Sequence, residues 1–193
     1  MDDFSAKTDR ELIKEILKDK NYFSYIVDRY ENKLKKYLFH LSGLNSDTVD
    51  DLLQEIFIKI YKNLNGYNPD FPFSSWVFRI AHNEMINFVK SAGAKLSGMT
   101  VKSDSDVDVI NLLESPVNMP AEADRKLLVE KINKIILGME ERYKSVLVLR
   151  FLEEKSYEEI GDILRIPVGT VSVQINRARK IFMQMVIDQK ILS

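Results

Sequence analysis

Apolar residues recur every three or four positions through most of the chain, the spacing that places them on one face of an α-helix. In the first half, helices are predicted to begin near Asp9 and Tyr22 and to span Thr48–Leu64 and Ser75–Ser91. In the second half, the stretches with helical spacing are residues 127–139, 143–151, 156–164 and 168–182. The pattern predicts an all-α fold.

Capping and breaking residues set the expected limits of these helices. Thr8 and Glu11 have the spacing of a capping box, and Gly43 is a plausible stop for the second helix. The third helix is expected to be capped by Ser46 or Thr48. Beyond it, residues 67–75 read YNPDFPFSS, with two prolines and no periodicity, which predicts a loop.

The stretch from Ser156 to Lys180 is predicted to fold as two short helices separated by a tight turn. Ser156 and Glu159 form a second capping box, and Pro167 ends the first of the two helices. The second helix has one apolar stripe and an opposite face that carries polar and cationic residues. Its stripe consists of Val171, Ile175, Ala178 and Phe182. The spacing alone suits either a DNA-binding helix-turn-helix or an ordinary helical hairpin with a solvated face.

Composition narrows the possible functions. The 193 residues include no cysteine and two histidines, which argues against disulfides and against thiol or histidine-rich metal sites. No cluster of nucleophile and base and no glycine-rich loop is present, so we expect no enzyme activity and no cofactor. A charged leader and a membrane-length apolar run are also lacking. We therefore expect a soluble, cytoplasmic protein that does not insert into membranes.

The net charge of −1 conceals an uneven distribution of charge along the chain. Residues 1–90 carry a net charge of −1, residues 91–124 carry −4, and residues 125–193 carry +4. The positive excess therefore lies with the predicted helix-turn-helix, where a DNA-binding surface needs it. The acidic middle stretch contains glycines and prolines and little amphipathic spacing, which is typical of a flexible linker.

Three regions of the sequence resemble bacterial RNA polymerase sigma factors of the extracytoplasmic-function group. SYEEIGDIL, IPVGTV and NRARK, between residues 156 and 180, resemble the DNA-binding domain at the C-terminus of these proteins. DDLLQEIFIKIY, at residues 50–61, resembles the segment that holds the clamp helices of the polymerase's largest subunit. FSSWVFRIAHN, at residues 73–83, resembles the segment that reads and melts the promoter element nearest the start site.

The resemblance implies two small helical domains joined by a flexible acidic linker. Residues 1–91 would be the region 2-like domain, which binds core polymerase and recognises and melts the −10 element. Residues 92–124 would be the linker, either a simple tether or a segment near the path of the nascent RNA. Residues 125–193 would be the region 4-like domain, whose helix-turn-helix recognises the −35 element. The implied partners are core polymerase, promoter DNA and an anti-sigma factor.

The resemblance also implies roles for particular residues. Asp51, Gln54 and Glu55 would contact the polymerase. The separated strand of the −10 element, with a flipped base captured in the preceding loop, would meet Asn68, Phe73, Ser74, Ser75, Trp76, Arg79, His82 and Asn83. The duplex of the −35 element would meet Arg150, Ser156, Tyr157, Thr170, Ser172, Val173, Asn176, Arg177 and Lys180. From the residues alone, the aromatic side chains could close the core or stack on bases, and core packing is the expected role for most of them individually.

The second helix of the helix-turn-helix departs from the family pattern. Ser172, Val173 and Gln174 follow GTV where relatives commonly carry a basic residue, a serine and an arginine, and Arg165 stands where glycine is frequent. We therefore expect base reading to depend on Asn176, with Arg177 and Lys180 holding phosphates. Two other functions remain open at this point. They are a stand-alone helix-turn-helix regulator and a sigma mimic that titrates an anti-sigma factor.

Overall fold

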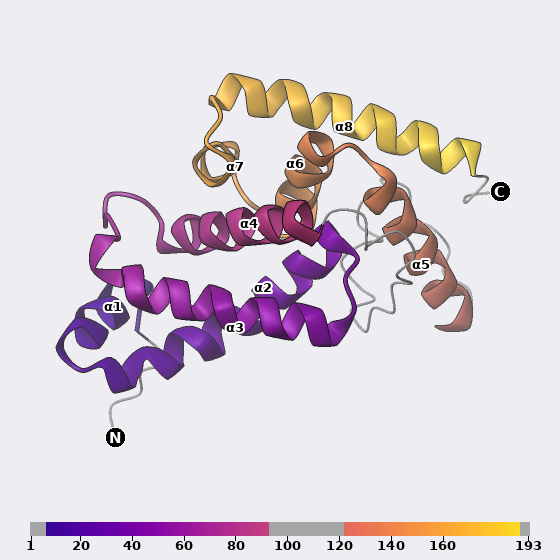
Figure 1. The fold of residues 1–193 in the computed structure, drawn as a ribbon. Coiled ribbons are helices and arrows are strands. Elements are labelled where there is room, and N and C mark those ends of the chain that lie inside the picture. The colour runs from indigo at the N-terminus through magenta and orange to yellow at the C-terminus, as the bar shows by residue number, and fades with distance from the viewer. Residues whose placement is uncertain (1–6, 93–121, 190–193) are drawn as a thin grey trace.

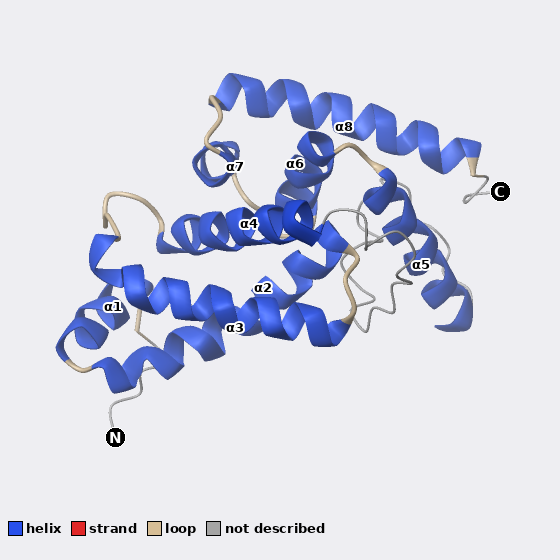
Figure 2. Ribbon diagram, viewed as in Figure 1, coloured by secondary structure: helices blue, strands red, loops and turns tan. Residues whose placement is uncertain are grey.

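The computed structural model describes residues 7–92 and 122–189, and all the regular structure within them is helical (Figures 1 and 2). The N-terminal unit consists of α1 (Asp9–Lys18), η2 (Lys20–Phe23), α2 (Ser24–Ser42), α3 (Ser46–Asn63), η3 (Leu64–Gly66) and α4 (Phe73–Ala92). The C-terminal unit consists of α5 (Glu122–Gly138), α6 (Glu141–Phe151), α7 (Tyr157–Leu164) and α8 (Val168–Asp188). The all-α prediction is confirmed. Of the predicted linker, residues 93–121 lie outside the described residues, whereas its two ends belong to α4 and α5.

Side-chain caps fix where several helices begin and end. Both predicted capping boxes form, between Thr8 and Glu11 and between Ser156 and Glu159. Gly43 ends α2 in the left-handed conformation, with φ of 67°, as its position predicted. The cap of α3 was predicted wrongly: Asn45 accepts from the Thr48 amide, so α3 begins at Ser46.

The start of α4 is a second correction. Residues 73–75 were predicted to belong to a loop, but α4 begins at Phe73, directly after Pro72. Proline is compatible with the start of a helix because its amide would have no helical partner there. The backbone carbonyl of Pro72 accepts from the Trp76 amide at 3.3 Å, which gives the first turn of the helix. Phe73 and Ser75 are consequently held by the helix and point into the protein.

The buried side chains of the two units form one continuous cluster. In the N-terminal unit, α2, α3 and α4 pack on one another around Tyr37, Leu38, Ile56 and Phe78. In the C-terminal unit, α8 lies across α6 and α7, and its predicted apolar stripe is buried there. Contacts of α2 with α5 and α6, and of α4 with α7, join the two cores (Figure 1). The sequence predicted two units but not this extensive contact between them.

The turn between α7 and α8 depends on close backbone packing. Arg165 ends α7 in the left-handed conformation, with φ of 56°, which is unfavourable for a residue with a Cβ atom. Gly161 lies against this turn, and a Cβ atom built on it would be 3.0 Å from the Ile166 carbonyl oxygen. The absence of a side chain at Gly161 therefore permits the close approach of this turn to α7. Within the described residues, no helix combines the length and apolar character needed to cross a membrane.

Candidate polymerase and DNA surfaces

The outer side of α3 carries the three residues predicted to bind polymerase. Asp51, Gln54 and Glu55 are exposed and lie three and four positions apart, so they share one face of the helix. The opposite face is buried through Leu52, Leu53, Ile56, Phe57 and Ile60. Within residues 7–92 and 122–189, no hydrogen bond or ion pair engages the three polar side chains. They are therefore available to a partner.

An exposed apolar side chain continues this outer side of α3. Ile58 follows Gln54 by four positions and Glu55 by three, and it is 51% exposed. Tyr61 lies one turn further along and is also exposed. The acidic residue preceding this face behaves differently, because Asp50 forms an ion pair of 2.6 Å with Lys35. We call Asp51, Gln54, Glu55 and Ile58 the α3 face.

Phe73 belongs to an aromatic cluster in the interior. It is 3% exposed, stacks on Trp76 with ring centroids 5.6 Å apart, and meets the edges of Tyr30 and Tyr67. Ser75 beside it is fully buried. Of the two uses that the sequence left open for the aromatic residues, Phe73 serves the core in this structure. Phe71, two residues earlier, remains exposed.

The segment before α4 is ordered by local hydrogen bonds. The Asn68 side chain accepts from the Asp70 amide at 3.0 Å, and the Tyr67 hydroxyl donates to the Phe71 carbonyl at 2.6 Å. The first of these bonds is an Asx turn, which Asn favours because its side chain mimics a backbone acceptor. Asn68 itself is exposed. Asn68 and Phe73 are the predicted DNA contacts within residues 68–73. Of these two, only Asn68 is accessible to a strand.

Two polar residues of α4 that were predicted to meet DNA contact α7 instead. Arg79 donates to the Asp162 carboxylate at 2.7 Å, and each side chain is 20% exposed. Ser74 donates to the Glu159 carboxylate at 3.3 Å. One turn beyond Arg79, His82 lies 2.9 Å from the Tyr37 hydroxyl, and burial lowers the pKa of its imidazole. At neutral pH His82 is therefore uncharged.

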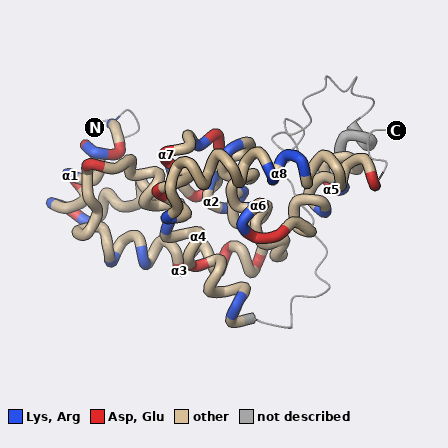
Figure 3. Tube along the Cα trace, turned by 90° about the horizontal axis from the view of Figure 1, so that it is seen from above, with Lys and Arg blue, Asp and Glu red and all other residues tan. Residues whose placement is uncertain are grey.

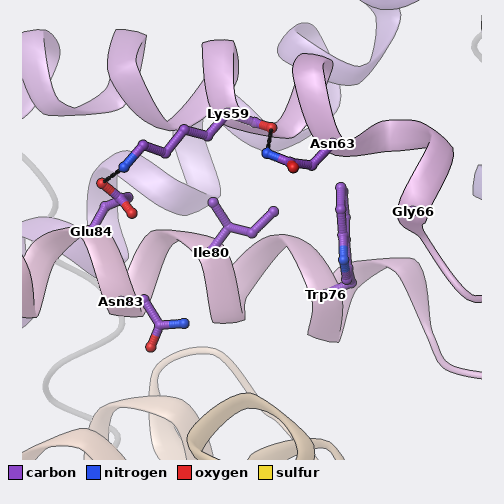
Figure 4. A pocket seen from close by; sticks show the side chains of 7 residues that line it. All are labelled: Lys59, Asn63, Gly66, Trp76, Ile80, Asn83 and Glu84. Carbon is purple, nitrogen blue, oxygen red and sulfur yellow. Dashed lines mark hydrogen bonds and ion pairs between the residues drawn. The ribbon is translucent and has the colours of Figure 1, made fainter.

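A cleft of about 330 Å³ lies between α3 and α4 (Figure 4). Trp76 and Ile80 point from α4 toward α3, and the backbone of Gly66 lies beside them. Asn83 lies at the margin of the cleft, with its side chain directed away from α3. Lys59 and Glu84 form an ion pair across the two helices, and the Asn63 side chain donates to the Lys59 carbonyl at 2.8 Å. The sequence analysis did not identify Lys59, Asn63 and Ile80 as site residues. When each helix is considered by itself, these positions look like ordinary helix positions.

The second helix of the helix-turn-helix presents a largely exposed face. Val173, Asn176, Arg177 and Lys180 are exposed, whereas Thr170 and Ser172 are partly covered. Val173 is 49% exposed, although valine is usually buried. A Cβ atom built on Gly169, one turn earlier, would meet nothing within 4 Å. We call Val173, Asn176, Arg177 and Lys180 the α8 face, and Figure 3 shows the basic stretch of α8 in blue.

Three further residues predicted to contact the upstream element support the turn before α7. Arg150 donates to the Lys155 carbonyl at 3.0 Å, and its guanidinium lies 5.5 Å from the centre of the Tyr157 ring. Ser156 is engaged in the capping box with Glu159. These contacts give Arg150 and Ser156 a structural role in this arrangement. Their contacts with DNA remain predictions.

No group of histidine, cysteine or carboxylate side chains suitable for a metal ion occurs in the described ranges 7–92 and 122–189. The candidate surfaces described above are the α3 face, the α8 face and the cleft between α3 and α4. Such faces are suited to recognising macromolecules.

Comparison with known protein families identifies two regions of the chain. Residues 26–95 match the model of "Sigma-70 region 2", and residues 130–181 match that of "Sigma-70, region 4". The first match contains the α3 face and the cleft. The second contains the helix-turn-helix and the α8 face.

Two curated relatives are similar over nearly the whole chain. The ECF RNA polymerase sigma factor SigW of Bacillus subtilis is 32% identical over 178 residues, which cover 87% of this chain and 91% of the relative. The ECF RNA polymerase sigma-E factor of Escherichia coli K12 is 32% identical over 182 residues, covering 90% of this chain and 91% of the relative. The similarity therefore includes both regions and their order.

Solved structures show the same fold at lower sequence identity. CnrH, solved in complex with the cytosolic domain of CnrY, has a TM-score of 0.69 and 20% identity, covering 93% of this chain and 97% of its own. The sigma factor RpoE of Bartonella quintana, solved in complex with the anti-sigma factor NepR, has a TM-score of 0.63 and 18% identity. That match covers 85% of this chain and 96% of RpoE.

Proposed function

We infer how this chain acts from its family, because it belongs to the extracytoplasmic-function (ECF) group of sigma-70 RNA polymerase sigma factors. It is therefore a sigma factor that directs promoter recognition by RNA polymerase, and not an enzyme. The observation that carries this function is the presence of region 2 and region 4 in order along one chain. A stand-alone helix-turn-helix regulator would not require region 2. We propose that the protein works in the cytoplasm, beside polymerase and DNA.

The most direct test of this function is reconstituted transcription. The purified chain is combined with core polymerase and fragmented genomic DNA, and the 5′ ends of the transcripts are mapped. Discrete start sites that require the chain are the expected result. A chain that binds an anti-sigma factor but yields no start sites would instead be a sigma mimic, the second function left open by the sequence.

We propose that the α3 face docks on the clamp helices of the polymerase's largest subunit. The face combines two carboxylates and an amide without partners in the described structure and an apolar side chain, Ile58, beside them. Apolar anchors surrounded by polar residues are typical of the centre of a protein interface. The carboxylates would meet a basic partner, and Ile58 would be covered on binding.

Reversal of charge on the α3 face tests this assignment. Asp51→Lys combined with Glu55→Lys is expected to lower affinity for core polymerase at least about a hundredfold, since two attractive contacts become repulsive. Asp28→Lys combined with Glu31→Lys is the matched control. It makes the same change of charge at two exposed acidic residues of α2. Equal affinity of the two double variants would refute the assignment.

We propose that the cleft between α3 and α4 receives a base from the separated strand of the −10 element. Its volume lies at the lower end of the range for small-ligand sites, about 300–1,000 Å³. Trp76 offers an aromatic edge and face, and the Asn83 amide can both donate and accept hydrogen bonds. A flipped base is usually read by this combination of stacking and hydrogen bonding.

Asn83→Ala is expected to reduce strand opening without reducing closed-complex formation, because a base enters the cleft only after the duplex separates. Permanganate footprinting of thymines in the polymerase–promoter complex measures opening. Asn87→Ala is the matched control, since Asn87 is an exposed amide one turn further along α4 and outside the cleft. Equal opening by the two variants would show that the cleft does not read a base.

We propose that the α8 face reads the −35 duplex. Asn176 would contact a base edge, Arg177 and Lys180 would hold phosphates, and Thr170 and Ser172 would lie at the margin of the contact. Val173 would place its methyl groups against a thymine methyl group, the apolar contact available in the major groove. We further propose that an anti-sigma factor is a partner, as one is for RpoE.

A further inference from the structure

A small pocket lies where α1, η2 and the end of α3 meet. Its volume is about 230 Å³, and its apolar walls come from Ile16 and Leu17 of α1 and from Tyr61 and Leu64 at the junction of α3 and η3. It shares no lining residue with the cleft between α3 and α4. None of the residues assigned above to polymerase or DNA lines it. The pocket is therefore a separate feature of the N-terminal unit.

Local contacts hold the walls of this pocket in place. The Phe23 ring meets the Tyr61 ring edge-on, with centroids 5.1 Å apart. The Asp19 side chain accepts from the Asn21 amide at 3.0 Å, which caps η2 and fixes its start. Ile16 is buried and belongs to the core. A pocket that is held in this way needs little reorganisation before it accepts a ligand, and this lowers the cost of binding.

The size of the pocket limits what can enter it. An apolar cavity of about 150 Å³ holds a benzene molecule, whereas sites for drug-sized ligands begin at about 300 Å³. The volume here lies between the two, so the pocket fits a single leucine or phenylalanine side chain. Two apolar residues beside it remain exposed to water, because Leu17 is 51% exposed and Tyr61 is 38% exposed. An inserted apolar side chain would cover both.

The polar part of the lining is positively charged. It consists of the exposed side chains of Lys20, Lys62 and Asn65, and none of the residues that line the pocket is acidic. The Lys20 ammonium lies 5.2 Å from the centre of the Tyr61 ring, beside the apolar wall. Neighbouring Lys18 differs, because it forms an ion pair of 3.1 Å with Glu15. The charge of the lining therefore favours an anionic occupant that also carries an apolar group.

We propose that this pocket is a docking site for an acidic peptide segment of a partner protein. The segment inserts one leucine or phenylalanine side chain beside Leu17 and Tyr61 and places carboxylates on Lys20 and Lys62. The Asn65 amide can donate to a carbonyl group of the peptide backbone. One apolar anchor within a polar rim is typical of the centre of a protein interface. The proposal goes beyond the sigma function and does not depend on the assignments of the polymerase and DNA surfaces.

The lining favours a peptide over a nucleic acid strand, although both are anionic. Single strands bind where bases stack on aromatic faces along a groove of cations. Tyr61 is the only aromatic residue of the lining, and Lys20 already lies over its ring. The remaining apolar walls are aliphatic, and two lysines are few for a strand of phosphates. A flexible aliphatic or phenyl side chain between two carboxylates matches this surface better.

Synthetic peptides test the docking site on the full chain. Each peptide carries aspartates around one variable position, which is leucine, phenylalanine or alanine, and binding is followed by the shifts of amide resonances in NMR spectra. The leucine or the phenylalanine peptide is expected to bind at least about tenfold more tightly than the alanine peptide, because a large apolar side chain is buried. The shifts should be centred on Leu17, Lys20 and Tyr61. Replacing the aspartates by lysines should weaken binding at least about tenfold.

Reversal of the lysine charges provides a second measurement. Lys20→Glu combined with Lys62→Glu is expected to weaken binding of the leucine or phenylalanine peptide at least about tenfold. Lys131→Glu combined with Lys134→Glu is the matched control, since it makes the same change at two exposed lysines of α5 in the other unit. The control should change affinity less than about twofold, because these charges are distant from the pocket and screened by salt.

Three results would overturn the inference. Equal binding of the aspartate and lysine peptides would show that the positive lining does not select the occupant. If no acidic peptide shifts the amides of the pocket at millimolar concentration, the pocket is not a docking site for such a segment. Tighter binding of an oligothymidylate at the same amides would assign the surface to a nucleic acid strand. The dispersion of the amide spectrum of each variant establishes that the fold is retained.

Discussion

The two helices of this sigma factor that we propose to contact DNA, α4 and α8, differ in how much of their predicted surface is accessible. On α4, Phe73 and Ser75 are buried, and Arg79 and Ser74 are engaged by α7. On α8, every residue of the α8 face is exposed. A resemblance to a family thus predicts contact positions on both helices. It does not tell whether a position is open to a ligand in the free protein.

The difference follows from how many sides of each helix are packed. Helix α8 buries one stripe against α6 and α7, and its other side faces outward. Helix α4 packs against α2 and α3 on one side and against α7 on another. Neighbouring residues of α4 therefore belong to the core, to the contact with α7 and to the cleft. Variants that change one of these roles at a time therefore test the difference between α4 and α8.

The largest effect is expected from Phe73, whose predicted role as a DNA contact conflicts with its burial. Phe73→Ala should lower the free energy of unfolding by about 3–4 kcal/mol, since it removes a buried ring from the aromatic cluster. Phe71→Ala, at a ring that is 49% exposed, should cost less than about 1 kcal/mol. Urea denaturation followed by circular dichroism measures both values. Similar losses of unfolding free energy in the two variants would contradict the assignment of Phe73, and not Phe71, to the core.

The next effect concerns the division of roles on the α8 face. Arg177→Ala and Lys180→Ala should each weaken binding to all upstream sequences alike and reduce the slope of log affinity against log salt by about 1. Asn176→Ala should instead relax preference at one or two base pairs, by about 1–3 kcal/mol. Run-off transcription from a randomised upstream element distinguishes the two behaviours. If Arg177→Ala alters the selected sequence and Asn176→Ala does not, the roles are reversed.

A smaller effect is expected from the apolar contact of Val173. In a promoter selected by the unchanged protein, replacing the contacted thymine by uracil removes one methyl group and should weaken binding roughly fourfold. Val173→Ala should bind the thymine and uracil promoters with nearly equal affinity. The comparison is made at each upstream thymine in turn, by electrophoretic mobility shift with the polymerase complex. Sensitivity to uracil that survives in Val173→Ala would assign the methyl contact to another residue.

The smallest effect lies in the turn that sets the position of α8. Arg165→Gly should raise the free energy of unfolding by about 0.5–1 kcal/mol, because glycine adopts a φ of 56° without steric cost. Gly43→Ala, at the left-handed end of α2, should lower it by about 1 kcal/mol for the converse reason. Thermal unfolding measures both. Lower stability of Arg165→Gly would mean that the arginine side chain stabilises the fold by more than its left-handed backbone conformation destabilises it.

The sequence predicted those features that depend on local chemistry. Both capping boxes, the stop at Gly43 and the buried stripe of α8 follow from residue type and spacing over a few positions. The start of α4 was predicted too late in the sequence. Proline is common both in loops and directly before a helix, and Pro72 was assigned to a loop. Local patterns cannot decide between these two uses.

Features that depend on long-range packing could not be predicted. Arg79 and Asp162 are 83 positions apart, and each reads as a solvated charge on its own helix. Helical periodicity shows which side of a helix is polar, but not whether that side meets water, DNA or a carboxylate of the other unit. The cleft residues Lys59 and Asn63 were missed for the same reason, since the cleft exists only where α3 and α4 meet.

The central claim is that α4 and α8 carry the DNA contacts of this sigma factor, so that α7 must leave α4 in the transcribing complex, and a distance measurement tests it most directly. The chain has no cysteine, so spin labels can be placed uniquely at Lys62→Cys on α3 and Glu158→Cys on α7, both exposed positions. Pulsed electron paramagnetic resonance should give one narrow distance in the free protein and a longer distance once a premelted promoter and core polymerase are bound. An unchanged distance in the complex, with the start site correctly used, would contradict the claim.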